Sequence, residues 1–223
     1  MFNPVSPLHY FAVGRSAREC IDASLAAAGK ADVRQILDFG CGHGRVLRVL
    51  RRMFPAAHIT ASDIDRDGVD FCARRFGAVG VYSDTDAAAV AFEDDFDLIW
   101  AGSVFTHIDK EAWSAFLSRL RDSLASDGVL VFTVGGPYVE QKIRSGENDY
   151  GLGQPTATSA LSDYAASGFG YGDYPGTNGY GIAIASPQAG QRLVEQAGLR
   201  MVNYQPKGWD NHQDVYACVR AAN

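Results

Sequence analysis

The sequence predicts a doubly wound α/β fold on a Rossmann-like, mostly parallel sheet of seven strands. Strand-like and helix-like hydrophobic periods alternate five times before residue 135, which is typical of parallel strands joined by crossover helices. Three glycines at alternate positions follow the first strand, where such folds bind ligands. Two strand-like segments joined by a short turn close the chain and predict an antiparallel hairpin at one edge.

The individual elements follow from hydrophobic periodicity and from the residues that begin or end them. Gly29 ends the first helix, Pro55 ends the second, and Asp109 is a good N-cap for the fourth. The expected helices are 16–28, 46–53, one through Phe71 and Cys72, one from Asp109 to Leu124, and 186–198. The expected strands are 35–39, 58–63, 79–83, 96–102, 128–134, 199–205 and 213–220.

Length and composition limit the possible classes of function. At 223 residues the chain is expected to form one domain, 1–223, and its 20 basic against 26 acidic residues argue against a nucleic-acid partner. No apolar run approaches the roughly 20 residues that span a bilayer, and the first residues lack the features of a signal peptide. The four cysteines lack the paired spacing of a zinc site or a disulfide framework. We therefore expect a cytoplasmic protein with reduced thiols, no membrane partner and no metal.

One segment departs from the alternating pattern. Residues 33–135 form the expected core and 186–223 a closing helix and β-hairpin, whereas 136–185 are rich in glycine and tyrosine and poor in aliphatic residues. This insertion is too long for a simple connection. We expect it to be either a functional cap or a mobile loop.

The stretch "ILDFGCGHGRV", residues 36–46, is the strongest local signal. Missing side chains at Gly40, Gly42 and Gly44 let the backbone turn tightly and approach a ligand closely. A dinucleotide fingerprint, G-x-G-x-x-G, would need its third glycine where Arg45 stands. A nicotinamide cofactor is therefore disfavoured, although an NAD(P)-dependent oxidoreductase stays an alternative, as does a glycine turn without a ligand.

The same stretch resembles the first motif of the class I S-adenosylmethionine-dependent methyltransferases. "ITASDID" is similar to the family's second motif, "FDLIWAGSVFTHI" to its fourth-strand segment, and "LRDSLASDGVLVFTV" to the helix and fifth strand that follow. The resemblance covers about residues 33–135. It implies S-adenosyl-L-methionine as cofactor, S-adenosyl-L-homocysteine as product, and a covering role over the cofactor for residues 1–30.

This resemblance also implies roles for single residues. The three glycines would lie under the methionine and ribose, and Asp38 would orient the turn or hold the ammonium group through water. Asp63 would accept hydrogen bonds from the ribose hydroxyls, and its rival Asp65 is better explained as a helix N-cap. The expected cofactor-binding residues are Asp38, Gly40, Cys41, Gly42, Gly44, Asp63, Ile64, Asp84, Ala101, Gly102, Ser103, Arg15 and Tyr10.

Two parts of that set have open alternatives. Adenine recognition is assigned to Asp84, with Asp86 or Ser83 as alternatives, and solvated loop acids explain these residues about as well. Arg15 is expected to pair with the methionine carboxylate and Tyr10 to cover the sulfonium. A surface arginine and a packed tyrosine explain the last two equally well.

The candidate catalytic residues are His212, His107 and Asp214. The first strand of the closing hairpin is expected to run parallel to the strands before it. The turn that follows it should therefore lie at the same edge of the sheet as the glycine turn. His212 is the expected general base, with a structural role as its alternative, and His107 has the alternative of bonding its own turn. A metal site of Asp210, His212 and Asp214 would lack a further ligand, so we expect none.

We expect methyl transfer to a hydroxyl of a small-molecule or glycan acceptor. Aromatic faces with polar edges suit sugars and other ring acceptors, and parts of the sequence also resemble bacterial methyltransferases associated with glycan systems. A methyltransferase-like protein that binds without catalysis is a further alternative. The sequence leaves the oligomeric state open.

Overall fold

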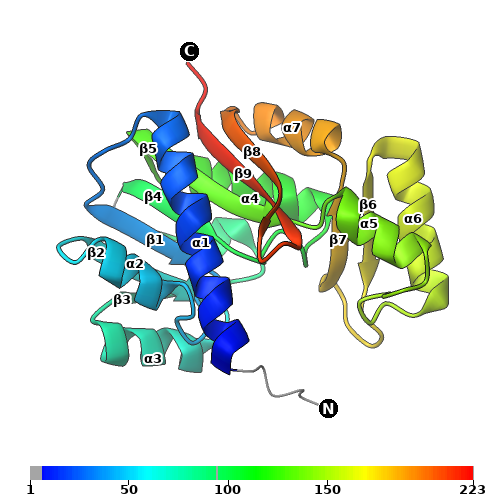
Figure 1. Ribbon diagram of the computed structural model, residues 1–223, viewed down its shortest axis with the longest axis horizontal. Coiled ribbons are helices and arrows are strands. Elements are labelled where there is room, and N and C mark those ends of the chain that lie inside the picture. Colours follow the sequence, from blue (N-terminus) through cyan, green and yellow to red (C-terminus); the bar gives the residue numbers. More distant parts are fainter. Residues whose placement is uncertain (1–6, 94, 223) are drawn as a thin grey trace.

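The computed structural model describes residues 7–93 and 95–222. Seven strands form one sheet in the order β3-β2-β1-β4-β5-β9-β8 (Figure 1). The strands β1 to β5 run parallel, and β9 is antiparallel to both of its neighbours. The predicted fold class is thus confirmed. The strands are β1 (Gln35–Phe39), β2 (His58–Asp63), β3 (Val79–Tyr82), β4 (Phe96–Ala101), β5 (Leu124–Val134), β8 (Leu199–Trp209) and β9 (Gln213–Arg220).

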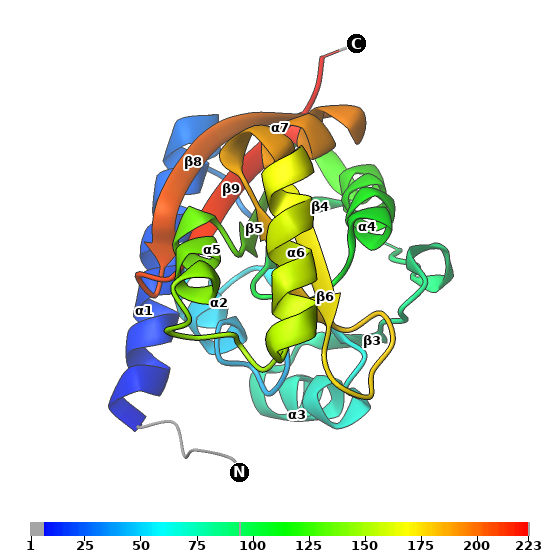
Figure 2. The same ribbon diagram turned by 90° about the vertical axis from the view of Figure 1, so that its right-hand side faces the viewer.

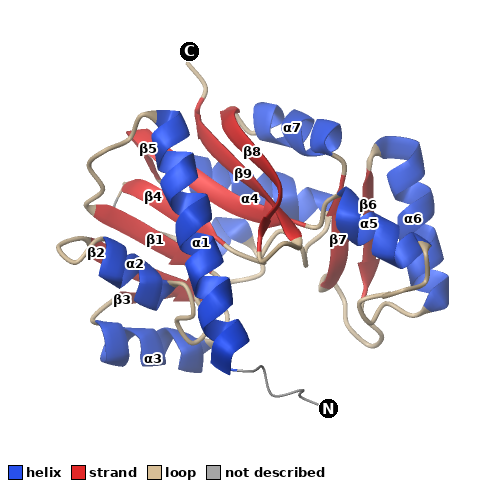
Figure 3. Ribbon diagram, in the orientation of Figure 1, coloured by secondary structure: helices blue, strands red, loops and turns tan. Residues whose placement is uncertain are grey.

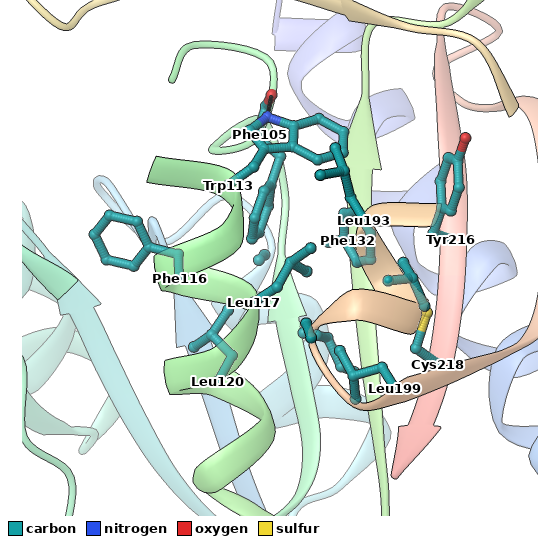
Figure 4. Close-up of a cluster of buried hydrophobic side chains, with 14 of the residues drawn as sticks. Phe105, Trp113, Phe116, Leu117, Leu120, Phe132, Leu193, Leu199, Tyr216 and Cys218 are labelled. Carbon is teal, nitrogen blue, oxygen red and sulfur yellow. Dashed lines mark hydrogen bonds between the residues drawn. The ribbon is translucent and has the colours of Figure 1, made fainter. Parts of the chain in front are cut away.

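Helices cover both faces of the sheet, because successive strand residues point to opposite sides (Figure 3). Ile36 of β1 is buried with α1, α2 and α3, whereas its neighbour Leu37 is buried with α4 and α7. In the second cluster the Trp113 indole donates a 2.7 Å hydrogen bond to the Phe105 carbonyl (Figure 4). These helices are α1 (Pro7–Ala28), α2 (Leu47–Met53), α3 (Arg66–Phe76), α4 (Lys110–Asp122) and α7 (Pro187–Gln196).

Several element boundaries differ from the sequence expectation, and one of them is the end of β8, which lies at Trp209 rather than at residue 205. The first helix begins at Pro7 rather than at residue 16, because Val13 continues the buried stripe of that helix across the sheet. The fifth strand begins at Leu124 rather than at residue 128, next to an irregularity in its pairing with β4. Within the described ranges, no helix combines the length and apolar character needed to cross a membrane.

The insertion, here called the cap, is folded into helices and strands, whereas the sequence left a mobile loop as one alternative. It contains α5 (Pro137–Arg144), α6 (Gln154–Ser167) and a two-stranded antiparallel sheet of β6 (Phe169–Asp173) and β7 (Gly181–Ala185). Its aliphatic residues are few but are gathered in one cluster with tyrosine side chains. Backbone hydrogen bonds of 2.9 and 3.0 Å join Ala183 to Thr106 and Gly181 to His107, so β7 is fixed to the turn after β4.

Candidate active site

Two adjoining hollows lie at the carboxyl ends of the strands, where open parallel sheets bind ligands. The smaller hollow has a volume of about 340 Å³ and the larger one about 450 Å³. Both are lined by Gly40, Gly102 and Ser103, so the turn after β1 and the turn after β4 form their common wall.

The glycine turn has the backbone conformation that the sequence predicts. Gly40 has a φ of +79°, and a Cβ atom there would lie 2.4 Å from Cγ2 of Val104. Gly42 has a φ of +46°, but a Cβ atom there would meet nothing within 4 Å. The first glycine is therefore required for packing inside the protein, whereas the second leaves open space beside the hollow.

Asp63, at the end of β2, holds this turn in place. Its Oδ2 accepts a 2.7 Å hydrogen bond from the Gly42 N–H, and its Oδ1 accepts a 2.9 Å bond from the Asp65 N–H. A carboxylate oxygen has lone pairs for a second bond, so Asp63 keeps capacity for a ligand. Asp65 occupies the N-cap position of α3 but makes no side-chain cap bond.

Asp38 is a buried carboxylate with unused hydrogen-bonding capacity. Its side chain is 2% exposed, it lines the smaller hollow, and its Oδ2 has no partner among the described residues. Burial, followed by the charge of Asp63, raises the pKa of Asp38 to about 7. A cationic ligand in the smaller hollow would compensate this carboxylate.

The larger hollow contains the residues expected near an adenine. Asp63, Ile64, Ser83 and Asp84 line it, and Ile64 is 60% exposed. The rival Asp86 instead accepts a hydrogen bond from Ala88 at a short 3-10 helix and is absent from the lining.

The two N-terminal candidates do not line either hollow. Arg15 is exposed and borders a shallow depression on the outside of α1, so the structure does not bring it to the predicted carboxylate site. Tyr10 packs its ring against the guanidinium groups of Arg45 and Arg48. Arg45 itself lines the smaller hollow, which makes it the arginine next to the site that sequence reasoning missed.

His107 connects the cap to the sheet. Its Nδ1 lies 2.8 Å from the Gly181 carbonyl oxygen and 3.3 Å from the Tyr174 hydroxyl, and burial lowers its pKa. The expected alternative, a bond within its own turn, is replaced by a bond to β7. Because the Gly181 oxygen is an acceptor, Nδ1 carries the proton in this contact, and Nε2 keeps a free lone pair. His107 also lines the larger hollow, so it fixes the cap and stays a candidate for proton transfer.

His212 faces the smaller hollow from the turn between β8 and β9. Burial lowers its pKa below the ordinary value of 6.5, so the imidazole is neutral at neutral pH. Figure 2 shows this turn beside α5 of the cap. The turn is fastened to α1, since Ser16 Oγ accepts a 2.8 Å bond from the Asp210 N–H and the Trp209 indole donates a 3.1 Å bond to the Val13 carbonyl.

Asp214 does not line either hollow, and its side chain is bonded to neighbouring residues of the protein. It is 1% exposed, and it accepts a 2.6 Å bond from the Tyr204 hydroxyl and a 2.8 Å bond from the Lys207 N–H. These contacts shape the β8–β9 turn, so the structure does not bring Asp214 together with His212 as a catalytic pair.

A polar network that the sequence did not reveal lies between the two hollows. Gln213 accepts a 2.6 Å bond from the Thr133 hydroxyl and donates a 3.0 Å bond to Ser103 Oγ, and Thr133 Oγ1 accepts a 2.8 Å bond from the Ser103 N–H. Ser103 has a φ of +64°, which non-glycine residues rarely adopt. The only sequence signal was the polar Thr133 near the end of an otherwise apolar strand.

The comparisons with known proteins agree with this geometry. Residues 36–128 match the family model described as "Methyltransferase domain". This match agrees with the resemblance of the sequence to the class I S-adenosylmethionine-dependent methyltransferases. The matched region contains β1, the glycine turn, Asp63 and β4, so the methyltransferase motif that the sequence suggested coincides with the walls of both hollows.

Two relatives of the chain have names that state their activities. The chain is 29% identical over 119 residues to a fatty-acid O-methyltransferase of Mycolicibacterium smegmatis, covering 51% of this chain and 42% of the relative. It is 25% identical over 199 residues to a malonyl-[acyl-carrier protein] O-methyltransferase of Paenibacillus sp., covering 86% of this chain and 63% of the relative. The chain thus spans less than two thirds of the length of these relatives.

A solved structure has the same fold. It is the magnesium protoporphyrin IX methyltransferase of Synechocystis with bound S-adenosylhomocysteine, matched with a TM-score of 0.61 and 16% identity over 99% of this chain and 89% of that one. At this identity the match concerns the fold alone.

Proposed function

We propose that the protein is an S-adenosylmethionine-dependent methyltransferase that transfers a methyl group to an oxygen, in the first place a hydroxyl, of a small-molecule or glycan acceptor. One observation carries this proposal: a bare glycine turn lies between the buried carboxylate of Asp38 and the turn-holding carboxylate of Asp63. Asp38 suits an ammonium group, and the free lone pairs of Asp63 suit ribose hydroxyls.

Other residues that line the two hollows suit the carboxylate and the adenine of the cofactor. Arg45 lines the smaller hollow, and a guanidinium suits a carboxylate. Ile64 offers an apolar face and Asp84 an acceptor in the larger hollow, which suits an adenine and its exocyclic amine. Because Asp38 and Arg45 both line it, the smaller hollow is suited to a zwitterionic amino acid group.

The cofactor supplies a methyl group on a sulfonium, which has a good leaving group. The protein therefore has to hold an acceptor oxygen in line and exclude water, and such positioning can contribute about 7–11 kcal/mol. A hydroxyl acceptor must also lose its proton. The neutral imidazole of His212, which faces the smaller hollow, is the group that we assign to accept it.

The names of the relatives support oxygen as the acceptor atom, because the two described above are O-methyltransferases. The test is to incubate the protein with S-adenosylmethionine and a panel of sugars, phenols and carboxylic acids, and to measure release of S-adenosylhomocysteine. Acceptor-dependent release that requires His212 is the expected result. Cofactor binding without release from any oxygen acceptor, while an amine acceptor reacts, would contradict the choice of oxygen.

A further inference from the structure

Three segments meet beside His212, at the outer side of the smaller hollow. The His212 ring centroid lies 5.4 Å from that of Tyr138 at the start of α5, and 5.6 Å from that of Tyr150 in the turn after α5. The Tyr150 hydroxyl is buried and has no hydrogen-bond partner among the described residues. A buried hydroxyl without a partner costs free energy. The Tyr150 hydroxyl is therefore available to form a hydrogen bond with a ligand at this corner, by which we mean the space beside His212, Tyr138 and Tyr150.

Two ammonium groups flank the same tyrosine ring. Nζ of Lys142, on α5, lies 5.1 Å from the Tyr138 centroid, and Nζ of Lys207, on the β8–β9 turn, lies 5.0 Å from it. Like charges that approach one ring from different segments repel each other unless an anion lies between them. Two ammonium groups thus approach one aromatic ring of the cap close to the proposed base.

The two ammonium groups differ in their ion pairs. Lys142 forms an ion pair with Glu147, but the Lys207 ammonium pairs with no carboxylate in residues 7–93 and 95–222. Asp214 accepts bonds from Tyr204 and from the Lys207 backbone, and Asp210 lies 3.5 Å from His9. The Lys207 ammonium is thus the one left available for a ligand.

We propose that the methyl acceptor carries an anionic group, a carboxylate or a phosphate, which binds between Lys207 and Lys142 while the acceptor oxygen faces His212. This inference rests on the proposed transfer function and specifies its substrate class. Ammonium groups bind carboxylates and phosphates as point charges. The Tyr138 face would pack against the body of the acceptor, and the Tyr150 hydroxyl would gain a partner at its polar edge.

The experiment compares matched phenols on the protein saturated with S-adenosylhomocysteine. The probes are 4-hydroxybenzoate, 4-hydroxyphenyl phosphate and the neutral 4-hydroxybenzamide, titrated by calorimetry at low ionic strength. We expect at least one anion to bind fivefold or more tightly than the neutral probe. Tighter binding of the phosphate would identify a phosphate-bearing acceptor, and tighter binding of the benzoate a carboxylate-bearing one.

Lysine variants test whether the tighter binding of an anionic probe depends on Lys207 and Lys142. The preference for the anionic probe should decrease in Lys207→Gln and decrease further when Lys142→Gln is added. The control is Lys110→Gln, which changes an exposed lysine at the start of α4 and should leave the preference unchanged. Equal affinities for all three probes, no binding of either anion, or a preference that survives the double change would each overturn the inference. Saturation with S-adenosylhomocysteine is measured first, so failure of the proposed function would be seen separately.

Discussion

The two sides of the active-site rim are built in different ways. On the cofactor side, the backbone of the glycine turn forms a common wall with the turn after β4, and the Asp63 carboxylate holds the glycine turn through the Gly42 N–H. On the acceptor side, His212 is placed by contacts with α1 and lies against Tyr138 and Tyr150 of the cap. The cofactor side therefore depends on local conformation, whereas the acceptor side depends on packing between segments that are distant in the sequence.

The largest expected effect lies within the glycine turn. Gly40→Ala would force a Cβ to within 2.4 Å of Val104 at a φ of +79°, and should lower the free energy of unfolding by about 2–4 kcal/mol and abolish cofactor binding. Gly42→Ala is the matched control, because its Cβ meets nothing. It should cost only about 1–2 kcal/mol of stability while still weakening cofactor binding. Thermal unfolding and calorimetry check both, and equal stability losses would contradict the distinction.

The acceptor side is tested by comparing the two histidines. His212→Ala should lower turnover about a hundredfold, the lower range for a general base, and leave the affinity for S-adenosylhomocysteine unchanged. His107→Ala should mainly lower the melting temperature, since its ring fixes Gly181 of the cap. Steady-state kinetics and thermal unfolding distinguish these results. Turnover that depends on His107 and not on His212 would reverse the assignment.

The pH profile sharpens the same assignment. Because burial lowers the pKa of His212 below 6.5, its neutral form persists to mildly acidic pH. Turnover should be constant above that lowered pKa and fall as the pH decreases through it. A rate that instead requires a group with a pKa above 6.5 to lose its proton would point to a different base.

Asp63→Ala should weaken cofactor binding tenfold or more, because ribose hydroxyls and the Gly42 N–H both lose an acceptor. Asp65→Ala is the control, since the Asp65 side chain makes no cap bond. Calorimetry with S-adenosylhomocysteine measures both affinities. Unchanged binding by the Asp63 variant would remove it from the site.

The smallest effect is the pH dependence that Asp38 imposes. Its pKa of about 7 means that the unliganded folded state keeps a proton that the unfolded chain releases near 3.8, so stability should decrease as the pH rises between these values. A bound ammonium favours the ionised form. Affinity for S-adenosylhomocysteine should therefore increase as the pH rises towards 7 and level off above it, and Asp38→Asn should flatten this profile.

The sequence marked the glycine turn and the strand end beside it more clearly than the surroundings of His212, for a physical reason. Gly40, Gly42 and Asp63 are recognisable because positive φ angles and the end of a buried strand restrict which residues can stand there. Arg15 is directed away from the rim by the extended first helix, and Arg45, which lines the smaller hollow, was not expected to bind the cofactor. The helices of the cap were not expected, because few aliphatic residues mark them.

Several expectations remain predictions. They are the division into a single domain with the parts 1–30, 33–135, 136–185 and 186–223, the cytoplasmic location, and the absence of nucleic-acid and metal partners. The full set of cofactor and catalytic residues is also a prediction, which the variants above are designed to test.

The most direct test of the central claim is a calorimetric titration of the unmodified protein with S-adenosylhomocysteine and, separately, with NAD. The claim is that the open backbone at Gly42, between Asp38 and Asp63, is the wall of a site for an adenosyl amino acid. We predict saturable binding of S-adenosylhomocysteine at one site and no binding of NAD. Binding of NAD alone, or of neither compound, would contradict the account.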